Sequence, residues 1–254
     1  MKERAFGYLI ELENKDSLLL NGRPVESVLQ AYQEDYTTPI DDISTPESIV
    51  NVVDQGPVGS CQGQSLAKCF QICYYLATGR VLNFSAMCGY IIAQEYDGIR
   101  GDRGSTLSGG QKVATKHGMC LERYWPDTKT YDPRPKAETY PFRLVSATPT
   151  NDPEQIRKAL GAGLPVQTGV AWLKSLDSET VTEYSGKSLG GHSTVLWGDV
   201  NINSWGPDWC GDGMQSWNDC LDEIVTYPGN TFVIYSPDSM SMPMLEPITT
   251  YGSL

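Results

Sequence analysis

Three residue types that together can cut an acyl bond occur in a fixed order along this chain. Cys61 follows the glycine-rich stretch "VVDQGPVGS", His192 stands in "LGGHSTVLWG", and Asn203 stands in "NINSWG". A thiolate is a strong nucleophile, an imidazole can take and return its proton, and an amide oxygen can orient the imidazole ring. The set therefore indicates nucleophilic chemistry centred on a cysteine.

Each of these residues also has a simpler explanation when it is taken alone. A cysteine before a helix is usually a small buried residue, a lone histidine is usually a hydrogen-bonded structural residue, and asparagine is common in turns. Their occurrence together in this order favours the catalytic interpretation. Trp205 and Trp209 follow closely and are expected to shield a His192–Asn203 hydrogen bond from water.

The elements that must position these residues can be read from the apolar spacing. A helix is predicted from Cys61 to Gly79, because apolar residues recur near every 3.6 positions and Gly79 follows the last of them. A thiol at a helix N-terminus has a stabilised thiolate, so we expect a lowered pKa for Cys61. The free N–H groups there can also hold an oxyanion.

Further helices are predicted at 85–98 and 108–118, and another begins at Pro153 with Asp152 as its N-cap. Residues 126–150 contain five prolines and are expected to form a connecting loop. The residue pattern changes after the helix that begins at Pro153. Four short segments rich in β-forming residues follow, at 164–172, 192–200, 201–206 and 230–236. A helix-rich first half and a strand-rich second half predict two lobes with a cleft between them.

Composition narrows the function classes. The chain has 254 residues, and its 19 basic and 31 acidic side chains leave a net charge of −12. Binding to nucleic acid or to an anionic membrane needs a basic face, so neither partner is expected. No apolar run reaches membrane-spanning length and no secretory signal opens the chain, which predicts a cytosol-like compartment, or a virion if the chain is packaged.

The cysteines do not form an obvious disulfide framework or a metal site. There are seven, an odd number, and in a cytosol-like compartment mostly reduced thiols are expected. Cys69, Cys73, Cys88 and Cys120, together with His117, match no common zinc spacing, so we expect core packing and predict neither metal nor cofactor.

The blocks "DQGPVGSCQGQS", "GGHSTVLWG" and "INSWGPDWCGDG" resemble the papain-like cysteine peptidases, in particular their bacterial and viral members. The local signature of that family places its histidine and asparagine roughly 130–150 residues after the cysteine, as His192 and Asn203 are placed after Cys61. Gln55, six residues before Cys61, matches the glutamine of the family's oxyanion hole. The resemblance spans residues 50–235.

The resemblance implies a fold, an activity and a site. The fold would be α+β, with a helical left lobe, a β-barrel-like right lobe and the active-site cleft between them. The activity would be peptide-bond hydrolysis through a Cys61 thioacyl-enzyme, with a peptide or protein as substrate. Cys61, His192, Asn203 and Gln55 would be catalytic, and Gly104 and Ser105 would pair with the substrate backbone. The peptidase domain would cover 51–236, between an N-terminal extension at 1–50, able to cross the cleft, and a C-terminal arm at 237–254.

The sequence departs from the family pattern at three places. Val58 replaces a cysteine of the local motif, which removes a usual left-lobe disulfide, and Gln62 replaces the aromatic residue after the nucleophile. The segment between His192 and Asn203 is short, so the chain must turn within Asp199 to Asn201 for Asn203 to reach the ring. A slip of one residue there would point Asn203 away.

Two other functions remain open from the sequence. One is a papain-fold structural or interaction protein packed in a larger assembly such as a viral particle, with or without residual peptidase activity. The other is acyl transfer to an amine instead of water by the same residues. A thiol-reactive peptidyl probe that labels Cys61 would favour peptidase activity over the structural role.

Overall fold

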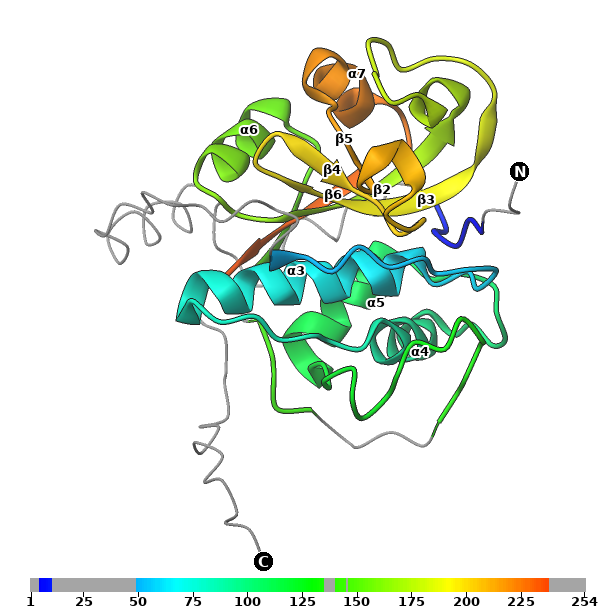
Figure 1. Ribbon diagram of the computed structural model, residues 1–254, viewed down its shortest axis with the longest axis vertical. Coiled ribbons are helices and arrows are strands. Elements are labelled where there is room, and N and C mark those ends of the chain that lie inside the picture. Colours follow the sequence, from blue (N-terminus) through cyan, green and yellow to red (C-terminus); the bar gives the residue numbers. More distant parts are fainter. Residues whose placement is uncertain (1–4, 11–48, 135–139, 145, 238–254) are drawn as a thin grey trace, which may run out of the picture.

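The chain folds into the two-lobed α+β architecture expected from its two contrasting halves. The computed structural model describes residues 5–10, 49–134, 140–144 and 146–237. Helices form one half of the molecule and an antiparallel sheet forms the other, with helix α3 lying along the boundary (Figure 1). The expected C-terminal arm at 237–254 lies, apart from Pro237, outside the described residues, as does most of the expected N-terminal extension.

The helical half contains α3 (Cys61–Thr78), α4 (Ala86–Asp97) and α5 (Leu107–Lys112), which continues into a π-helical turn (Val113–His117). The predicted ends are confirmed. Gly79 ends α3 and Gly98 ends α4, each in the left-handed conformation that a residue without Cβ adopts easily.

The sheet half contains six strands in the order β1-β6-β2-β3-β4-β5, and every pairing is antiparallel. The sheet does not close, so the barrel-like description holds only loosely. The strands are β1 (Ser146–Thr150), β2 (Val166–Leu173), β3 (Ser188–Trp197), β4 (Val200–Ile202), β5 (Met214–Gln215) and β6 (Thr231–Ser236).

The prediction of a loop over 126–150 is wrong for its last five residues, because these form strand β1. β1 pairs only with β6, at the edge of the sheet, and Pro149 lies within it. Proline is tolerated in an edge strand because its missing N–H breaks no central ladder. Pro149 is therefore compatible with an edge strand, which the sequence pattern alone did not distinguish from a loop.

Two short helices cover part of the sheet half: α6 (Pro153–Gly161) and α7 (Leu221–Thr226). The predicted start of α6 is confirmed, because the Asp152 side chain accepts the backbone N–H of Glu154 at 2.9 Å. No helix in the four described ranges has the length and apolar character needed to cross a bilayer.

Two hydrophobic clusters form the core of the molecule. The first includes the buried faces of α3 and α4, with Cys69 and Cys73 packed in it as expected, and it continues to Val195 and Tyr235 of the sheet. The second lies within the sheet half and is built around Trp172 and Trp217, which are fully buried. Because the first cluster contains residues of both lobes, it packs the two lobes together along one seam.

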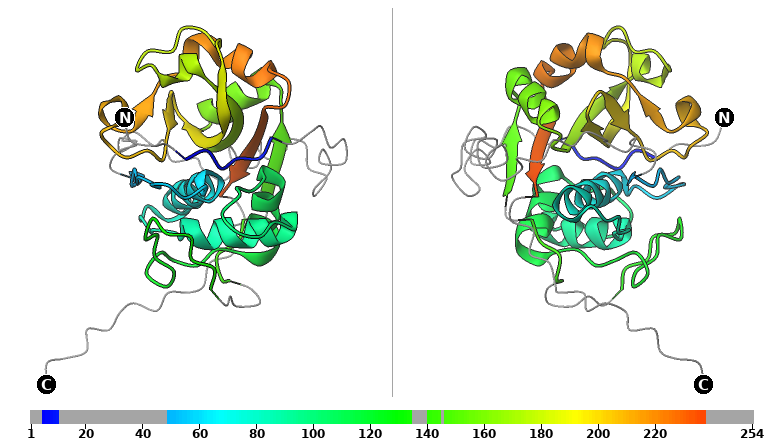
Figure 2. Two further views of the ribbon diagram at one scale, coloured as in Figure 1. Left: turned by 90° about the vertical axis from the view of Figure 1, so that its right-hand side faces the viewer. Right: turned by 60° about the vertical axis from the view of Figure 1, so that its left-hand side comes forward.

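Residues 5–10 form an extended segment that lies between the two lobes. Figure 2 shows this segment, in blue, passing above α3 and below the sheet in both views. It is bonded to both lobes, because the Tyr8 N–H donates to Gly191 O at 3.1 Å and the Leu9 N–H donates to Ser105 O at 3.0 Å. We call residues 5–10 the cover segment.

Candidate active site in the cleft

The Cys61 thiol stands at the first residue of α3, where the sequence predicts it. In the preceding turn the Ser60 N–H donates to Val58 O at 2.8 Å, and the Ser60 carbonyl then accepts the Gln64 N–H at 2.9 Å as the first bond of the helix. Gly56 has a φ of +62°, which lets the loop reverse direction shortly before the helix. The flexible, glycine-rich loop thus delivers a thiol to a helix N-terminus, where backbone N–H groups have no helical partner.

The surroundings of Cys61 contradict the lowered pKa expected from its helix position. The side chain is 0% exposed, and burial raises the pKa of its thiol to about 11. Backbone hydrogen bonds from Gly7, Ser193, Gln62 and Tyr8 act in the opposite direction but do not cancel the desolvation. Two of these four bonds come from the cover segment, so the thiol is held neutral in a cleft that the chain itself fills.

The same bonds bring Cys61 to the strand that carries His192. Ser193, the residue after His192 on β3, makes a backbone hydrogen bond to the thiol. Its hydroxyl oxygen also lies 2.7 Å from that of Ser65, one turn along α3 from Cys61. The thiol of Cys61 in one lobe and the strand that carries His192 in the other therefore meet across the seam.

The imidazole of His192 is bonded to Asn203. His192 Nε2 lies 2.8 Å from Asn203 Oδ1, and the ring is fully buried. The short connection between the two residues does not prevent this contact. β3 and β4 form a tight hairpin in which Trp197 pairs with Val200, and Gly198 takes a φ of +58° at the turn.

Aromatic rings enclose the imidazole. The indole of Trp205 stacks on it, with ring centroids 4.4 Å apart and an interplanar angle of 22°. Trp172 and Phe6 meet it edge-on, at 5.0 Å and 5.8 Å. Trp209 packs against Trp205, with ring centroids 5.6 Å apart. The expected shielding of the His192–Asn203 bond therefore comes from Trp205 directly and from Trp209 through it.

Gln55 is buried beside the same group of residues. Its backbone N–H donates to Ser204 O at 2.9 Å, and its side-chain oxygen accepts the Ser204 hydroxyl. Its Nε2 donates to Val58 O at 2.8 Å and lies 3.5 Å from Ala5 O of the cover segment. The side-chain amide therefore faces a peptide carbonyl, as a donor to an oxyanion would have to do.

The cover segment pairs with Ser105, one of the two residues expected to bind a substrate backbone. The Ser105 N–H donates to Gly7 O at 2.9 Å, and Ser105 O accepts the Leu9 N–H, which makes a short parallel bridge. A Cβ on Gly104 would lie 2.1 Å from Gly7 O, and the φ of Gly104 is +80°. Only glycine fits there, because the peptide backbone passes so closely.

The Tyr8 side chain fills a pocket beside the thiol. It is 3% exposed, its hydroxyl oxygen lies 2.7 Å from Thr231 Oγ1, and its ring covers Gly169, where a Cβ would meet the ring at 2.5 Å. The sequence reasoning missed Tyr8 and Phe6. Phe6 and Tyr8 stand two residues apart in "AFGYLI", a spacing that would place both aromatic side chains on one face of a strand.

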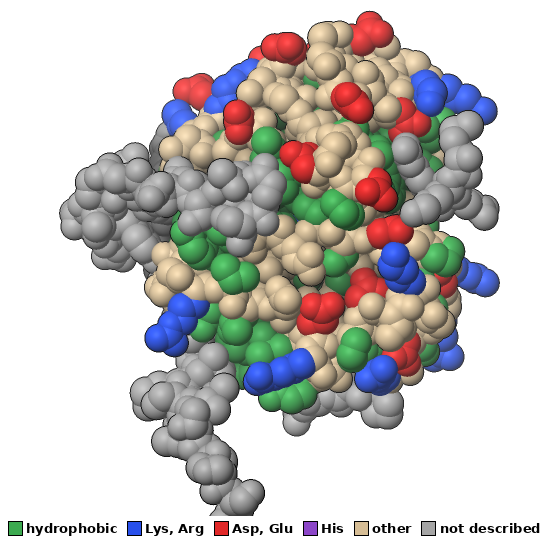
Figure 3. Space-filling model, in the orientation of Figure 1, with side chains coloured by type: hydrophobic (Ala, Val, Ile, Leu, Met, Phe, Trp, Pro, Cys, Tyr) green, Lys and Arg blue, Asp and Glu red, His purple; other side chains and the backbone are tan. Residues whose placement is uncertain are grey.

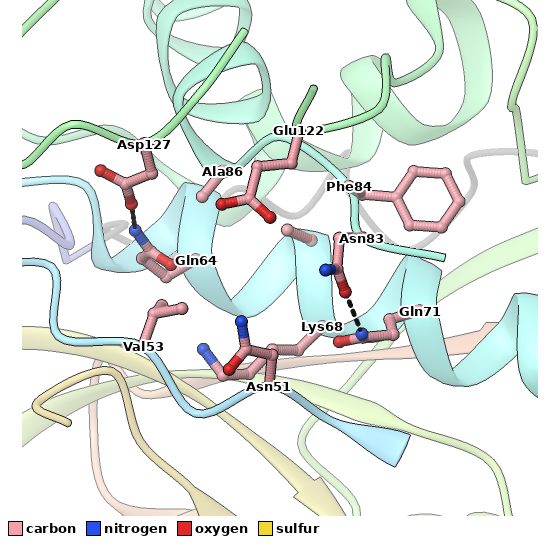
Figure 4. A pocket seen from close by; sticks show the side chains of 11 residues that line it. Asn51, Val53, Gln64, Lys68, Gln71, Asn83, Phe84, Ala86, Glu122 and Asp127 are labelled. Atoms are coloured by element: carbon pink, nitrogen blue, oxygen red, sulfur yellow. Dashed lines mark hydrogen bonds between the residues drawn. The ribbon is translucent and has the colours of Figure 1, made fainter. Parts of the chain in front are cut away.

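A second hollow lies along a different face of α3 (Figure 4). Its volume is about 30 Å³, and Gln64, Lys68 and Gln71 line it from the helix. Gln64 donates to Asp127, and Gln71 donates to Asn83 at 2.9 Å. Burial lowers the pKa of Lys68 to about 8, against the opposing attraction of Asp127. None of the expected site residues lines this hollow.

Charged side chains of both signs are interspersed over the face of the molecule drawn in Figure 3. Exposed ion pairs such as Lys129–Asp54, at 3.0 Å, contribute little to stability in water.

Comparison with known proteins finds similar solved structures, but no match to a family model or to a curated protein sequence. Among solved structures, xylellain, a cysteine protease from Xylella fastidiosa, is similar over 92% of this chain and 97% of its own, with a TM-score of 0.65 and 19% identity.

Two pro-enzymes are similar as well. ProCathepsin B from Trypanosoma congolense has a TM-score of 0.60 at 17% identity, over 91% of this chain and 86% of its own. Digestive procathepsin L 3 of the Tenebrio molitor larval midgut also has a TM-score of 0.60 at 17% identity, over 84% and 79%. The chain has the papain-like cysteine protease fold.

Proposed function

We propose that the protein is a cysteine peptidase whose nucleophile is Cys61. The observation that carries this proposal is that the cleft holds an extended peptide, the cover segment, directly over the thiol. A cleft that pairs with a peptide backbone through Ser105 and Gly191 can bind a substrate in the same place once the cover segment has left. The papain-like fold supports the same function.

The residues have distinct roles in the proposed reaction. His192 takes the proton of the Cys61 thiol, the resulting thiolate adds to the carbonyl carbon, and the oxygen takes up the negative charge beside the Gln55 amide and the backbone N–H of Cys61. His192 gives its proton to the departing amine, the C–N bond breaks, and a thioester on Cys61 remains. Asn203 keeps the imidazole ring in the orientation that this transfer needs.

Water completes the cycle. His192 removes a proton from water as the oxygen adds to the thioester, the C–S bond breaks, and the carboxylic acid leaves while the thiol is restored. Trp205 keeps bulk water away from the His192–Asn203 bond, which strengthens that bond. We further propose that the enzyme is an endopeptidase, because the paired cover segment extends on both sides of the residues nearest the thiol.

In this proposal residues 1–50 are an N-terminal extension and residues 51–236 are the peptidase domain. The cover segment of this extension hinders access of a substrate to the thiol of Cys61, because that thiol is fully buried beneath the segment. Four of the similar solved structures are pro-forms by name, which supports an inhibitory role for the extension.

A labelling experiment tests the proposal. A peptide carrying a thiol-reactive group should modify Cys61 of the full chain slowly, and should modify it faster when Tyr8→Ala loosens the cover segment. Cys61→Ala should take up no label at that position. A folded Tyr8→Ala protein whose Cys61 reacts with iodoacetamide, but with no peptidyl probe, would refute the peptidase function.

A further inference from the structure

The substrate-binding residue Ser105 and the catalytic helix belong to separate segments, and something must hold them in register. The described residues contain no disulfide. Val58 and Gln62 stand where the family motif has a cysteine and an aromatic residue, so two common means of fastening the cysteine loop are missing. Hydrogen bonds are found instead on both sides of Cys61, at Gly59 and at Gln62.

Gln62, the residue after the nucleophile, is bonded directly to the substrate-binding strand. The Ser105 hydroxyl donates to Gln62 Oε1 at 2.9 Å, and both side chains are 0% exposed. The backbone carbonyl of Gln62 accepts Gln167 Nε2 at 3.0 Å and the Ser65 hydroxyl at 2.9 Å. Gln62 is thus fixed at both ends, and it ties the first turn of α3 to Ser105.

The Tyr90 hydroxyl makes a second link. It accepts the backbone N–H of Gly104 at 2.9 Å and donates to Asp102 Oδ1 at 2.8 Å. The same carboxylate oxygen accepts the backbone N–H of Gly59 at 2.9 Å. One buried hydroxyl and one carboxylate oxygen therefore join Gly104, next to Ser105, to Gly59, two residues before Cys61.

Gln94, one turn further along α4, completes the contact. Its Nε2 has two hydrogens and lies within hydrogen-bond distance of three acceptors: Gly104 O at 2.9 Å, Gly101 O at 2.8 Å and the Tyr90 hydroxyl at 3.0 Å. Both backbone groups of Gly104 are therefore bonded to α4. The backbone groups of the next residue, Ser105, face the cleft, where they now pair with the cover segment.

We infer that Gln62, Tyr90 and Asp102 are positioning residues that hold the peptide-binding backbone of Ser105 at a fixed distance from Cys61. This inference rests on the proposed peptidase function. The two links start on opposite sides of Cys61. The link from Gly59 ends at Gly104, and the link from Gln62 ends at Ser105. A peptide bound to Ser105 is thereby presented to the thiol in one register, which is the condition for efficient attack.

The link through Tyr90 keeps its donor over the working pH range. Burial, together with the bond to Asp102, raises the pKa of the Tyr90 hydroxyl well above its ordinary value. The hydroxyl is therefore protonated near neutral pH and can donate to Asp102 while accepting from Gly104. Phenylalanine preserves the ring packing and removes the bonds of the hydroxyl to Asp102, Gly104 and Gln94.

The test compares two reagents on the same thiol, in full chains that all carry Tyr8→Ala to loosen the cover segment. Iodoacetamide needs only an accessible thiolate, whereas a peptidyl probe also needs the Ser105 ladder. Gln62→Met and Tyr90→Phe should each lower the ratio of the peptidyl rate to the iodoacetamide rate about tenfold. The iodoacetamide rate itself should stay within about twofold.

Matched controls separate positioning from general loosening. Gln71→Met changes another buried glutamine of α3, and Tyr74→Phe another buried tyrosine of the same lobe; both should leave the ratio unchanged. At position 102, Asp102→Asn keeps the oxygen that accepts both bonds and should retain the ratio, whereas Asp102→Ala should lower it.

The outcomes are distinguishable. An unchanged ratio in Gln62→Met and Tyr90→Phe, with Cys61 still selective for the peptidyl probe, would overturn the positioning role and leave the peptidase function standing. A thiol without any selectivity for the peptidyl probe, before Gln62 or Tyr90 is changed, would refute the peptidase function itself. A ratio that falls equally in Gln71→Met would show a structural effect only and would also overturn the inference.

Discussion

The imidazole of His192 lies 2.8 Å from the side-chain oxygen of Asn203 and is stacked on Trp205, so its orientation is fixed by one bond and one ring. Both contacts depend on the tight β3–β4 hairpin. Because Trp197 pairs with Val200, the chain reverses in a two-residue turn, Gly198 and Asp199, and Asn203 comes to lie beside His192. The geometry leads to a first prediction.

Asn203→Ala should lower kcat/KM for a peptide substrate on the order of 10²-fold, because the ring loses the bond that selects its tautomer. The effect should appear in kcat more than in KM, since the Asn203 side-chain oxygen is bonded to His192 and Ser204 and not to residues 5–10 of the cover segment. The control is Asn218→Ala, at an exposed position, which should match the unaltered protein. Equal loss in both variants would contradict the role given to Asn203.

The pH dependence of Cys61 alkylation should report the cover segment. Burial raises the pKa of the thiol to about 11 in the covered cleft, so the reactive thiolate should accumulate only as the pH rises toward that value. In Tyr8→Ala the thiol regains water and helix N–H groups, and the midpoint of the rate profile should move to lower pH.

Mass-spectrometric mapping of iodoacetamide adducts between pH 6 and pH 10 measures this shift. Cys69 provides an internal control, because it is fully buried in the helical core and should stay unmodified in both proteins. Identical profiles for Cys61 in the two proteins would show that the cover segment does not determine its pKa.

The bond between Tyr8 and Thr231 should stabilise the covered state. Thr231→Val keeps the volume of the side chain and removes the partner of the Tyr8 hydroxyl, a loss of about 1 kcal/mol or about fivefold in opening. Tyr8→Ala also removes the buried ring and should increase opening on the order of 100-fold.

Both changes can be measured as the rate of Cys61 alkylation at constant pH. The double variant is informative, because Thr231→Val should add little to a chain that already lacks the Tyr8 hydroxyl. Full additivity of the two effects would mean that the hydroxyl bond does not contribute to closure.

Lys68 should make stability depend on pH outside the cleft. Burial lowers the pKa of its ammonium from 10.5 to about 8 in the folded protein. Between those values the unfolded chain holds a proton that the folded chain has lost, so the free energy of unfolding should rise as the pH rises through this window. The expected gain is on the order of 3 kcal/mol.

Urea unfolding of the unaltered protein and of Lys68→Met, at pH 7 and pH 10, isolates this contribution. Other groups titrate in the same range in both proteins, so the difference between the two pH dependences is the quantity to compare. A gain of equal size in Lys68→Met would show that Lys68 is not its source.

Much of the fold could be predicted because the decisive signals are local. Gly79 and Gly98 follow the last apolar residues of two helices, and Asp152 precedes Pro153, so these three helix ends needed no knowledge of the partner lobe. β1 was missed because its identity as a strand depends on β6, which lies far along the chain.

The contacts of the site needed the tertiary structure. The helix position of Cys61 predicts a lowered pKa, but burial under Gly7 and Tyr8 has the larger effect and reverses the sign. Tyr90 and Gln94 are four residues apart on α4, a spacing that also suits ordinary buried side chains. Only the path of the loop that ends at Gly104 shows what they bind.

Because the cover segment belongs to the same chain as the cleft, its binding is unimolecular. A tethered strand competes at an effective concentration that its tether sets and that does not depend on the concentration of the protein. Diluting the protein should therefore leave its latency unchanged. A single cut between residue 10 and residue 49 would turn the strand into a separate, diffusible ligand that is lost on dilution.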